Sequence, residues 1–139
     1  MKLRKAKSSD KKDLMKLVKG LYGRSSTQSV KDWEKYHSKY MKNAVLAQEN
    51  NQVIAYIAFN LRKNYVYIGD LYVLPKHRKK GVASKLLKFV ENYSKKVKRD
   101  LRVDVRKKDR PAKRFYEKHK FIYFSNKNKG SIKLIKVLK

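Results

Sequence analysis

The sequence predicts a mixed α/β fold, with six to seven strands in one sheet and about four helices. Three observations support this prediction. Apolar segments between residues 44 and 74 follow one another at hairpin spacing, which indicates an antiparallel meander. The last of these strands, at 65–74, leads into a helical segment at 82–98 and then a strand at 101–105, and such a crossover makes the two strands parallel. Residues 121–138 add two more short strands after a helical segment, so we expect one domain over the whole chain.

The N-terminal residues are expected to add an edge strand and a helix. Residues 1–7 alternate weakly between polar and apolar, as a short strand does. Residues 10–19 have the apolar spacing of a helix, with Ser8 or Ser9 as its N-cap. Gly20, Gly23 and the segment Arg24-Ser-Ser-Thr are expected to break this helix.

The central segment of the chain is the strand at 65–74 together with the helix that follows it. The strand reads YVYIGDLYVL and is almost continuously apolar, which predicts that it is buried on both faces until Pro75 ends it. A basic turn containing Gly81 then opens the helix, whose apolar residues recur every three to four positions. The first turn of a helix has unpaired N–H groups and the positive end of the dipole, so this junction predicts an anion site.

The composition is strongly basic. Lys and Arg number 39 against 11 Asp and Glu, a formal net charge of +28. Such a charge attracts nucleic acid, ribosomes, acidic lipid or phosphorylated ligands, although lysines that only coat a solvated surface explain it equally well. The chain has no cysteine, and therefore forms no disulfide and no acyl-thioester with its substrate. It has no apolar run long enough for a membrane span and no signal peptide, so we expect a soluble, cytoplasmic protein.

Two short patterns carry a family resemblance. The turn reads Arg78-Lys79-Lys80-Gly81-Val82-Ala83, and this R-x-x-G-x-A pattern after V-x-P resembles the acetyl-CoA pyrophosphate loop of the GNAT family of N-acetyltransferases. About thirty residues later, Ala112 and Tyr116 resemble the A-x-x-x-Y part of that family's second motif, with Phe121 at the start of the next strand. The order of elements along the whole chain also resembles that fold.

The second motif departs from the family pattern at two positions. Asp109 stands where the family usually has Asn, and a carboxylate lacks the donor that an amide offers to the pantetheine arm. Lys120 stands where the family usually has Gly, which predicts a different turn geometry because Lys tolerates positive φ poorly.

The resemblance implies an acyl-CoA N-acyltransferase fold in which the two central parallel strands splay apart around acetyl-CoA. Backbone groups of the first strand would pair with the pantetheine arm, and the N–H groups of the turn would cradle the pyrophosphate. The basic side chains of the turn either contact the phosphates or are simply solvated. The residues expected at the cofactor are Leu71, Tyr72, Val73, Arg78, Lys79, Lys80, Gly81, Val82, Ala83, Ser84 and Asp109.

The implied reaction is direct attack of a primary amine on the thioester in a ternary complex. An alkylammonium has a pKa of roughly 10.4, so the amine must first lose a proton, which a carboxylate in or near the cleft could take through water. Asp104 is the first candidate for this base and Asp70 the second, with a cross-strand partner and a buried acceptor as their structural alternatives. Tyr116 is the candidate acid for the departing thiolate, against the alternative of a packing aromatic.

We expect no metal site, because His37, His77 and His119 share no ligand spacing. Ser84 has no recognisable partners for serine hydrolase chemistry. A second helical segment, at 30–41, and the residues around it are where we expect the acceptor.

The sequence does not name the acceptor amine. The net charge favours an amine on a protein or associated with RNA over a free polyamine or aminoglycoside. The competing hypothesis is a non-catalytic nucleic-acid- or ribosome-binding module on the same fold. We expect no membrane partner, and a monomer or a homodimer.

Overall fold

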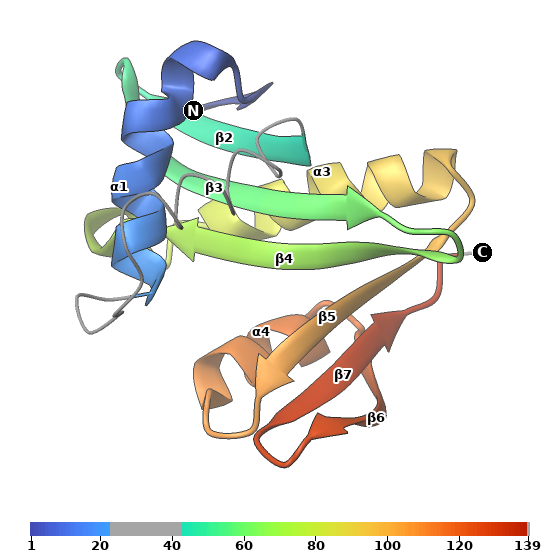
Figure 1. The fold of residues 1–139 in the computed structure, drawn as a ribbon. Coiled ribbons are helices and arrows are strands. Elements are labelled where there is room, and N and C mark those ends of the chain that lie inside the picture. The colour runs from blue at the N-terminus through green and yellow to red at the C-terminus, as the bar shows by residue number, and fades with distance from the viewer. Residues whose placement is uncertain (23–42, 139) are drawn as a thin grey trace. The chain divides into compact units, whose positions relative to one another are not determined.

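The structure is a computed structural model that describes residues 1–22 and 43–138 (Figure 1). The helix expected at 30–41 lies outside the described residues. In chain order the elements are β1 (Lys2–Lys5), a 3-10 turn (Ser8–Asp10), α1 (Lys11–Tyr22), β2 (Ala44–Glu49), β3 (Gln52–Leu61), β4 (Tyr65–Val73), a 3-10 turn (Pro75–His77), α3 (Val82–Lys96), β5 (Asp100–Arg106), α4 (Arg110–Lys118), β6 (Ile122–Asn128) and β7 (Ser131–Lys136).

The sheet has seven strands in the order β1-β2-β3-β4-β5-β7-β6. β1, β2 and β3 pair antiparallel, and so do β5, β7 and β6. β4 and β5 pair parallel, with Tyr65–Ile68 of β4 alongside 100–103 of β5. The mixed sheet and the parallel crossover through α3 confirm the predicted fold class.

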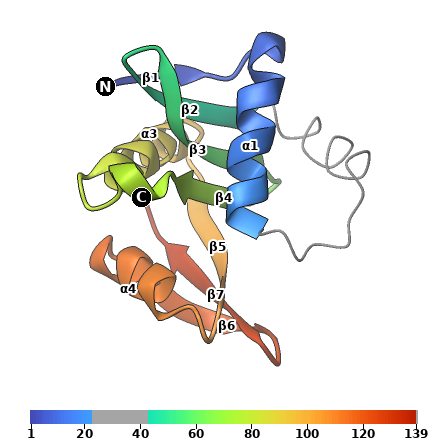
Figure 2. The ribbon, with the colours of Figure 1, turned by 90° about the vertical axis from the view of Figure 1, so that its left-hand side faces the viewer.

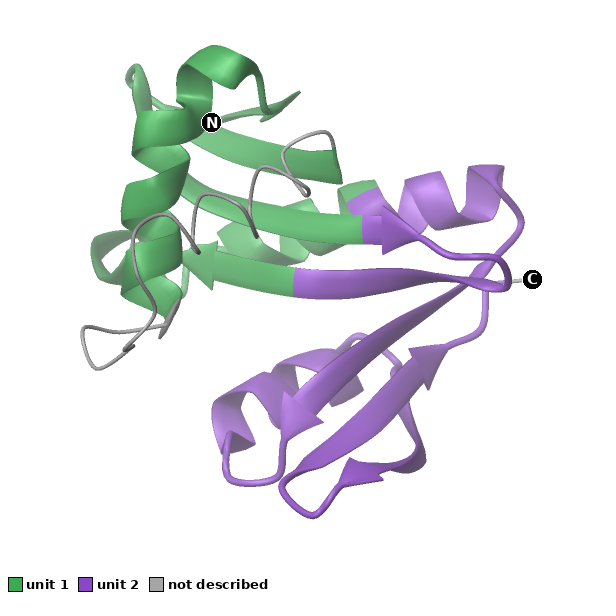
Figure 3. Cartoon of the chain, in the orientation of Figure 1, with its two compact units in different colours: residues 1–59, 70–89 green, residues 60–69, 90–139 purple. Residues whose placement is uncertain are grey.

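The chain forms two compact units, which divide β4 and α3 between them (Figure 3). Unit 1 contains Met1–Phe59 and Asp70–Phe89, and unit 2 contains Asn60–Gly69 and Val90–Lys139. The core of unit 1 is a cluster of buried side chains from α1 and strands β2 and β3: Leu14, Leu17, Val18, Leu46, Val53, Tyr56 and Ala58.

α1 runs through Gly20 to Tyr22, so the break expected at Gly20 is wrong, while Gly23 and residues 24–27 lie outside the described residues. A Cβ atom at Gly20 would lie 2.5 Å from the Tyr72 hydroxyl and 2.8 Å from the ring carbon that bears it. The glycine therefore lets the ring of Tyr72 lie against the helix, and this packing offsets the low helix propensity of glycine.

The helix start also differs from the expected serine cap. Asp10 accepts a hydrogen bond from the backbone N–H of Lys7 at 2.7 Å and a bidentate pair of bonds from Arg4 at 2.7 and 2.8 Å. The hydrogen bonds from Arg4 hold the pKa of the buried Asp10 carboxyl below its usual value, against the opposing effect of burial. An ion pair, rather than Ser8 or Ser9, therefore fixes the entry to α1.

In unit 2, β5 alternates between the two faces of the sheet. Leu101, Val103 and Val105 are buried, whereas Arg102 and Asp104 between them are half-buried. α4 contacts β5 and lies beside the β5–β7–β6 part of the sheet (Figure 2). The other face of these strands carries the charged residues.

The turn after α4 keeps the geometry that a glycine would give, so the different turn expected at Lys120 is wrong. Lys120 has a φ of 73°, in the left-handed region. Its N–H donates to the Glu117 carbonyl, and the Phe121 N–H donates to the Tyr116 carbonyl, both at 3.0 Å. The ring of Phe121 packs edge-on against Tyr116 at 5.1 Å. These two bonds and the contact form a Schellman motif, which holds Lys120 in its strained conformation.

β4 is not buried on both faces as predicted. Val66, Ile68 and Asp70 are buried, whereas Tyr65 and Tyr67 are only half-buried. β3 is the strand that is buried continuously, from Val53 to Phe59. Over residues 65–68, β4 therefore has one buried apolar face and one half-buried face of tyrosines.

Candidate functional site

The turn between β4 and α3 has the features of an anion site. Gly81 has a φ of 81°, where side chains are strained, and a Cβ there would meet no atom within 4 Å. Its carbonyl accepts the first helical bond, from Lys85 N–H at 3.1 Å, so α3 begins directly after it. The N–H groups of the first helical turn, Val82 to Ser84, therefore start beside an open backbone segment that a ligand can approach.

Arg78 holds this turn against the end of β4. Its Nε donates to the Val73 carbonyl at 2.9 Å, and its guanidinium lies 5.3 Å from the ring centre of Tyr72. The Leu74 N–H donates to the Ile54 carbonyl of β3 at 2.8 Å. The guanidinium therefore links three of the residues expected at the cofactor, and positions the loop.

Lys79 and Lys80 directly precede the glycine. Lys79 also has a positive φ, of 62°, so the loop uses two left-handed residues within three positions. Both side chains are exposed. Ala83 and Ser84 are half-buried and Val82 is buried, as expected for the first turn of a helix that packs on one side.

Asp70 lies at the point where β4 passes from unit 2 into unit 1, directly before Leu71. It is 4% exposed, and its Oδ2 accepts a hydrogen bond from the Tyr56 hydroxyl at 3.1 Å. Tyr56, on the neighbouring β3, is 1% exposed. The tyrosine satisfies one oxygen of a carboxylate that would otherwise be costly to bury.

Asp104 has two partners in unit 2. Its Oδ2 accepts from the Tyr67 hydroxyl at 2.9 Å and lies 2.7 Å from the Lys127 ammonium. The side chain is 16% exposed. The cross-strand pairing that stood as its structural alternative is therefore present, and it occupies one of the two carboxylate oxygens.

Asp109 and Tyr116 have structural roles at opposite ends of α4. Asp109 is the N-cap, accepting from the Ala112 N–H at 3.2 Å. Tyr116 is 6% exposed, and its ring packs edge-on against Phe115 and Phe121. The carboxylate at position 109 thus begins the helix that carries Tyr116.

The two histidines among the described residues, His77 and His119, contact a carboxylate and an aromatic ring respectively. His77 Nδ1 lies 3.4 Å from a Glu49 carboxylate oxygen, without hydrogen-bond geometry. His119 stacks on Phe115 at 4.7 Å, and burial lowers its pKa below the usual value while Glu91 acts in the opposite direction. Over residues 1–22 and 43–138, no three His, Asp or Glu side chains lie together as a metal site would require.

The structure therefore gathers the predicted residues into two sets. The end of β4 and the turn, from Asp70 to Ser84, belong to unit 1, and Asp104, Asp109 and Tyr116 belong to unit 2. The sequence reasoning missed Tyr56 and Tyr67, which bind the two candidate bases. Tyr56 lies on the strand next to Asp70, and Tyr67 is separated from Asp104 by the crossover through α3, so both contacts become visible only once the strand pairing is known.

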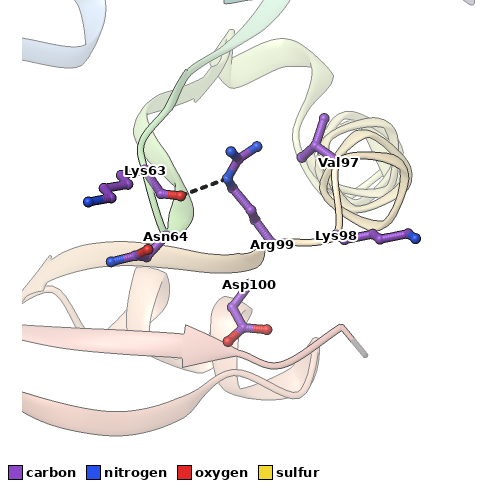
Figure 4. A pocket seen from close by; sticks show the side chains of 6 residues that line it. All are labelled: Lys63, Asn64, Val97, Lys98, Arg99 and Asp100. Atoms are coloured by element: carbon purple, nitrogen blue, oxygen red, sulfur yellow. Dashed lines mark hydrogen bonds between the residues drawn. The ribbon is translucent and has the colours of Figure 1, made fainter.

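A surface pocket of about 370 Å³ lies in unit 2 at the beginning of β4, at the opposite end of that strand from Val73. Its lining residues are Lys63, Asn64, Val97, Lys98, Arg99 and Asp100 (Figure 4). Arg99 Nε donates to the Lys63 carbonyl at 2.9 Å. The pocket includes no residue expected at the cofactor.

None of the described helices has the length and hydropathy needed to cross a bilayer.

Known proteins resemble this chain in sequence and in fold. The chain is 26% identical over 104 residues to an aminoglycoside N(6′)-acetyltransferase type 1 of Acinetobacter haemolyticus, covering 68% of this chain and 72% of that protein. The crystal structure of PaiA N-acetyltransferase from Thermoplasma acidophilum, in complex with coenzyme A, has a TM-score of 0.77 and 20% identity over 98% of both chains. A ribosomal-protein-alanine N-acetyltransferase from Brucella melitensis has a TM-score of 0.82 and 13% identity, over 99% of this chain and all of the other.

Residues 12–121, most of the chain, match the sequence model of the Acetyltransferase (GNAT) family. The match contains the turn around Gly81 and the α4 segment that carries Tyr116. The cosubstrate of this family is acetyl-CoA, and the open backbone at Gly81 beside the start of α3 fits its pyrophosphate. The chain is therefore a member of the GNAT family of N-acetyltransferases.

Proposed function

We propose that the protein transfers the acetyl group of acetyl-CoA directly to a primary amine that is carried by a protein or associated with RNA. The binding of acetyl-CoA is supported by the turn at Gly81. This glycine has a positive φ, has open space where a Cβ would lie, and precedes the first turn of α3. Backbone N–H groups from Lys79 to Ser84 would bind the pyrophosphate there.

The end of β4 would hold the rest of the cosubstrate. Backbone groups of Leu71, Tyr72 and Val73 would pair with the pantetheine arm as an added strand does, and the N–H of Val73 would polarise the acetyl carbonyl. Arg78 supports this by fixing the Val73 carbonyl at 2.9 Å. Acetyl-CoA supplies an activated thioester, and the protein supplies its orientation and the proton transfers.

The proton transfers would be made by a carboxylate and a tyrosine. Asp104 would take a proton from the attacking ammonium, through water and through its second oxygen, since Oδ2 is already bound by Tyr67 and Lys127. Asp70 is the second candidate for this base. Tyr116 would donate to the leaving thiolate, and Asp109 would contribute at the cofactor by fixing the start of α4.

The acceptor class rests on charge. A net charge of +28 repels polycations, which argues against free polyamines and against aminoglycosides, despite the name of the relative from A. haemolyticus. The same charge favours an acceptor with nucleic acid nearby, such as a ribosomal protein or an aminoacyl-tRNA.

The test is release of thiol from acetyl-CoA with panels of acceptors. We expect turnover with N-terminal peptides of basic ribosomal proteins or with aminoacyl-tRNA, and little with spermidine or kanamycin. Efficient turnover of spermidine, with no retention of the protein on an RNA column, would contradict the acceptor class. A melting temperature that does not change at millimolar acetyl-CoA would instead favour the non-catalytic binding module.

A further inference from the structure

One face of unit 2 carries aromatic rings and guanidinium groups in alternation. The Arg102 guanidinium lies 4.2 Å from the ring centre of Tyr65 and 4.9 Å from that of Phe124, and Arg62 lies 5.7 Å from the ring centre of Tyr67. We call the set Tyr65, Tyr67, Arg102 and Phe124 the aromatic platform. All four residues belong to unit 2.

Strand register places Tyr65, Tyr67 and Arg102 on a single face of the sheet, and Phe124 joins them through its contact with Arg102. Arg102 pairs directly with Tyr67 on β4 and with Ile135 on β7, and directly paired residues point to the same side. Tyr65 lies two positions before Tyr67, and therefore also on this side. The buried face of β5, with Leu101 and Val103, is the opposite one.

The platform continues onto an exposed edge strand. β6 is last in the sheet order, and its Phe124 is 50% exposed. Ile122 and Tyr123 beside it are also exposed, at 61% and 59%. Ile122 pairs with Ile135 on the face of the platform, whereas Tyr123 pairs with Leu134 on the opposite face. Exposed large apolar side chains such as Ile122 and Phe124, on the surface of so polar a protein, indicate a contact site.

Arg102 is fixed by the rings rather than by hydrogen bonds. Its Nε is buried and has no acceptor among the described residues. The guanidinium lies 4.2 and 4.9 Å from the two ring centres, and it adds positive charge to an aromatic surface. This arrangement is the one that a planar, anionic partner would complement.

The charges around the platform have the sign that a phosphate backbone requires. The two carboxylates of this strand face are already engaged: Asp104 with Lys127 and Tyr67, and Asp100 with the Leu138 N–H. The basic side chains at the same surface are Arg62, Arg102, Lys127 and Lys133. Lys133 is placed there because it is the register partner of Asp104 on β5.

We propose that this face binds single-stranded nucleic acid, with bases stacked on Phe124 and the platform tyrosines and phosphates paired with the surrounding basic side chains. Stacking needs unpaired bases, because their faces are covered in a duplex. The aromatic rings distinguish this site from a lysine-coated surface, which would attract a duplex equally well. The inference is independent of acetyl transfer, and holds whether or not the nucleic acid carries the acceptor amine.

The test is fluorescence anisotropy with a labelled RNA of about 12 unpaired nucleotides, at about 0.15 M salt. Phe124→Ala should weaken binding by roughly five- to fiftyfold through the loss of stacking. Tyr123→Ala is the matched control, since it removes an equally exposed ring whose register partner is the buried Leu134 of the other face, and it should change affinity less than about twofold. Acetyl-CoA binding measured in parallel should be unchanged in both variants, which separates this proposal from the cofactor site.

A second pair of variants separates stacking from charge. Arg102→Gln should weaken binding much more than Lys88→Gln, which removes one exposed charge from α3. Melting temperatures establish that each variant is folded. Equal effects of Phe124→Ala and Tyr123→Ala, equal affinity for a duplex of the same length, or loss of a dimer rather than of RNA affinity in Phe124→Ala would each overturn the proposal.

Discussion

Replacing Lys120 by glycine should stabilise the protein, although the change removes a side chain and introduces the most flexible residue. Lys120 is held at a φ of 73° by the Schellman motif that ends α4. A residue with a Cβ in this region is strained by about 1–2 kcal/mol, whereas glycine is not. Glycine costs roughly 0.5–1 kcal/mol more in backbone entropy on folding. The difference leaves a gain of about 0.5–1 kcal/mol.

The assay is urea unfolding followed by circular dichroism, with thermal unfolding as a second measure. A gain of this size should raise the melting temperature by about 2–4 °C in a chain of this length. Lys118→Gly is the matched control, because that lysine lies in the last turn of α4 with helical geometry. It should destabilise the protein by about 0.5–1 kcal/mol. A Lys120→Gly variant that is no more stable than the wild type would show that the turn is not left-handed at this position.

Three other changes test separate parts of the structure. Gly20→Ala should destabilise by about 1 kcal/mol in urea unfolding, because its Cβ would overlap the Tyr72 ring, whereas an open helical site would gain stability. Tyr116→Phe should reduce the turnover number by about ten- to a thousandfold with little change in acetyl-CoA affinity, and full turnover with chemistry rate-limiting would leave this tyrosine a packing residue. The pKa of Asp10 is lowered in the folded state, so the stabilisation from its bond with Arg4 is complete above pH 3.8 and is lost as the pH falls through the folded-state pKa. Asp10→Asn should therefore lower the free energy of unfolding by about 2 kcal/mol at pH 7 and flatten its pH dependence in acid. A pH dependence that does not change in this variant would refute the pairing.

Local pattern was sufficient to predict the order of strands and helices. The crossover from β4 through α3 to β5 follows from one apolar run, one helical period and a second strand, and handedness rules leave few other topologies. The turn at Gly81 was also predictable, because a glycine between a strand end and a helix start favours a positive φ, which the structure has at this position. Both features depend on residues close together in the chain.

Features that depend on strand pairing could not be predicted in this way. The tyrosines of β4 read as core residues, and only the register with β5 shows that Tyr67 meets Asp104 and that Arg102 lies between two rings. Gly20 was predicted to break the helix because the residue that packs against it, Tyr72, is about fifty positions away in the chain. In each case a tertiary contact reversed the local preference.

The same limit applies to the candidate base. Spacing identified Asp70 and Asp104 as carboxylates in central strands, but it could not show that Tyr56 and Tyr67 bind them. Separate Asp70→Asn and Asp104→Asn variants, compared in the pH dependence of turnover, should show loss of the acidic limb in the one that removes the base. Unchanged profiles in both would exclude each carboxylate from this role.

Isothermal titration of acetyl-CoA against variants of Gly81 tests most directly that the turn between β4 and α3 is the cofactor site. Gly81→Ala introduces a Cβ and backbone strain without charge, and should weaken binding severalfold. Gly81→Asp adds a negative charge beside the pyrophosphate and should abolish measurable binding, while Arg78→Ala should weaken it much less. Wild-type affinity in Gly81→Asp, in a variant that remains folded, would show that acetyl-CoA binds elsewhere.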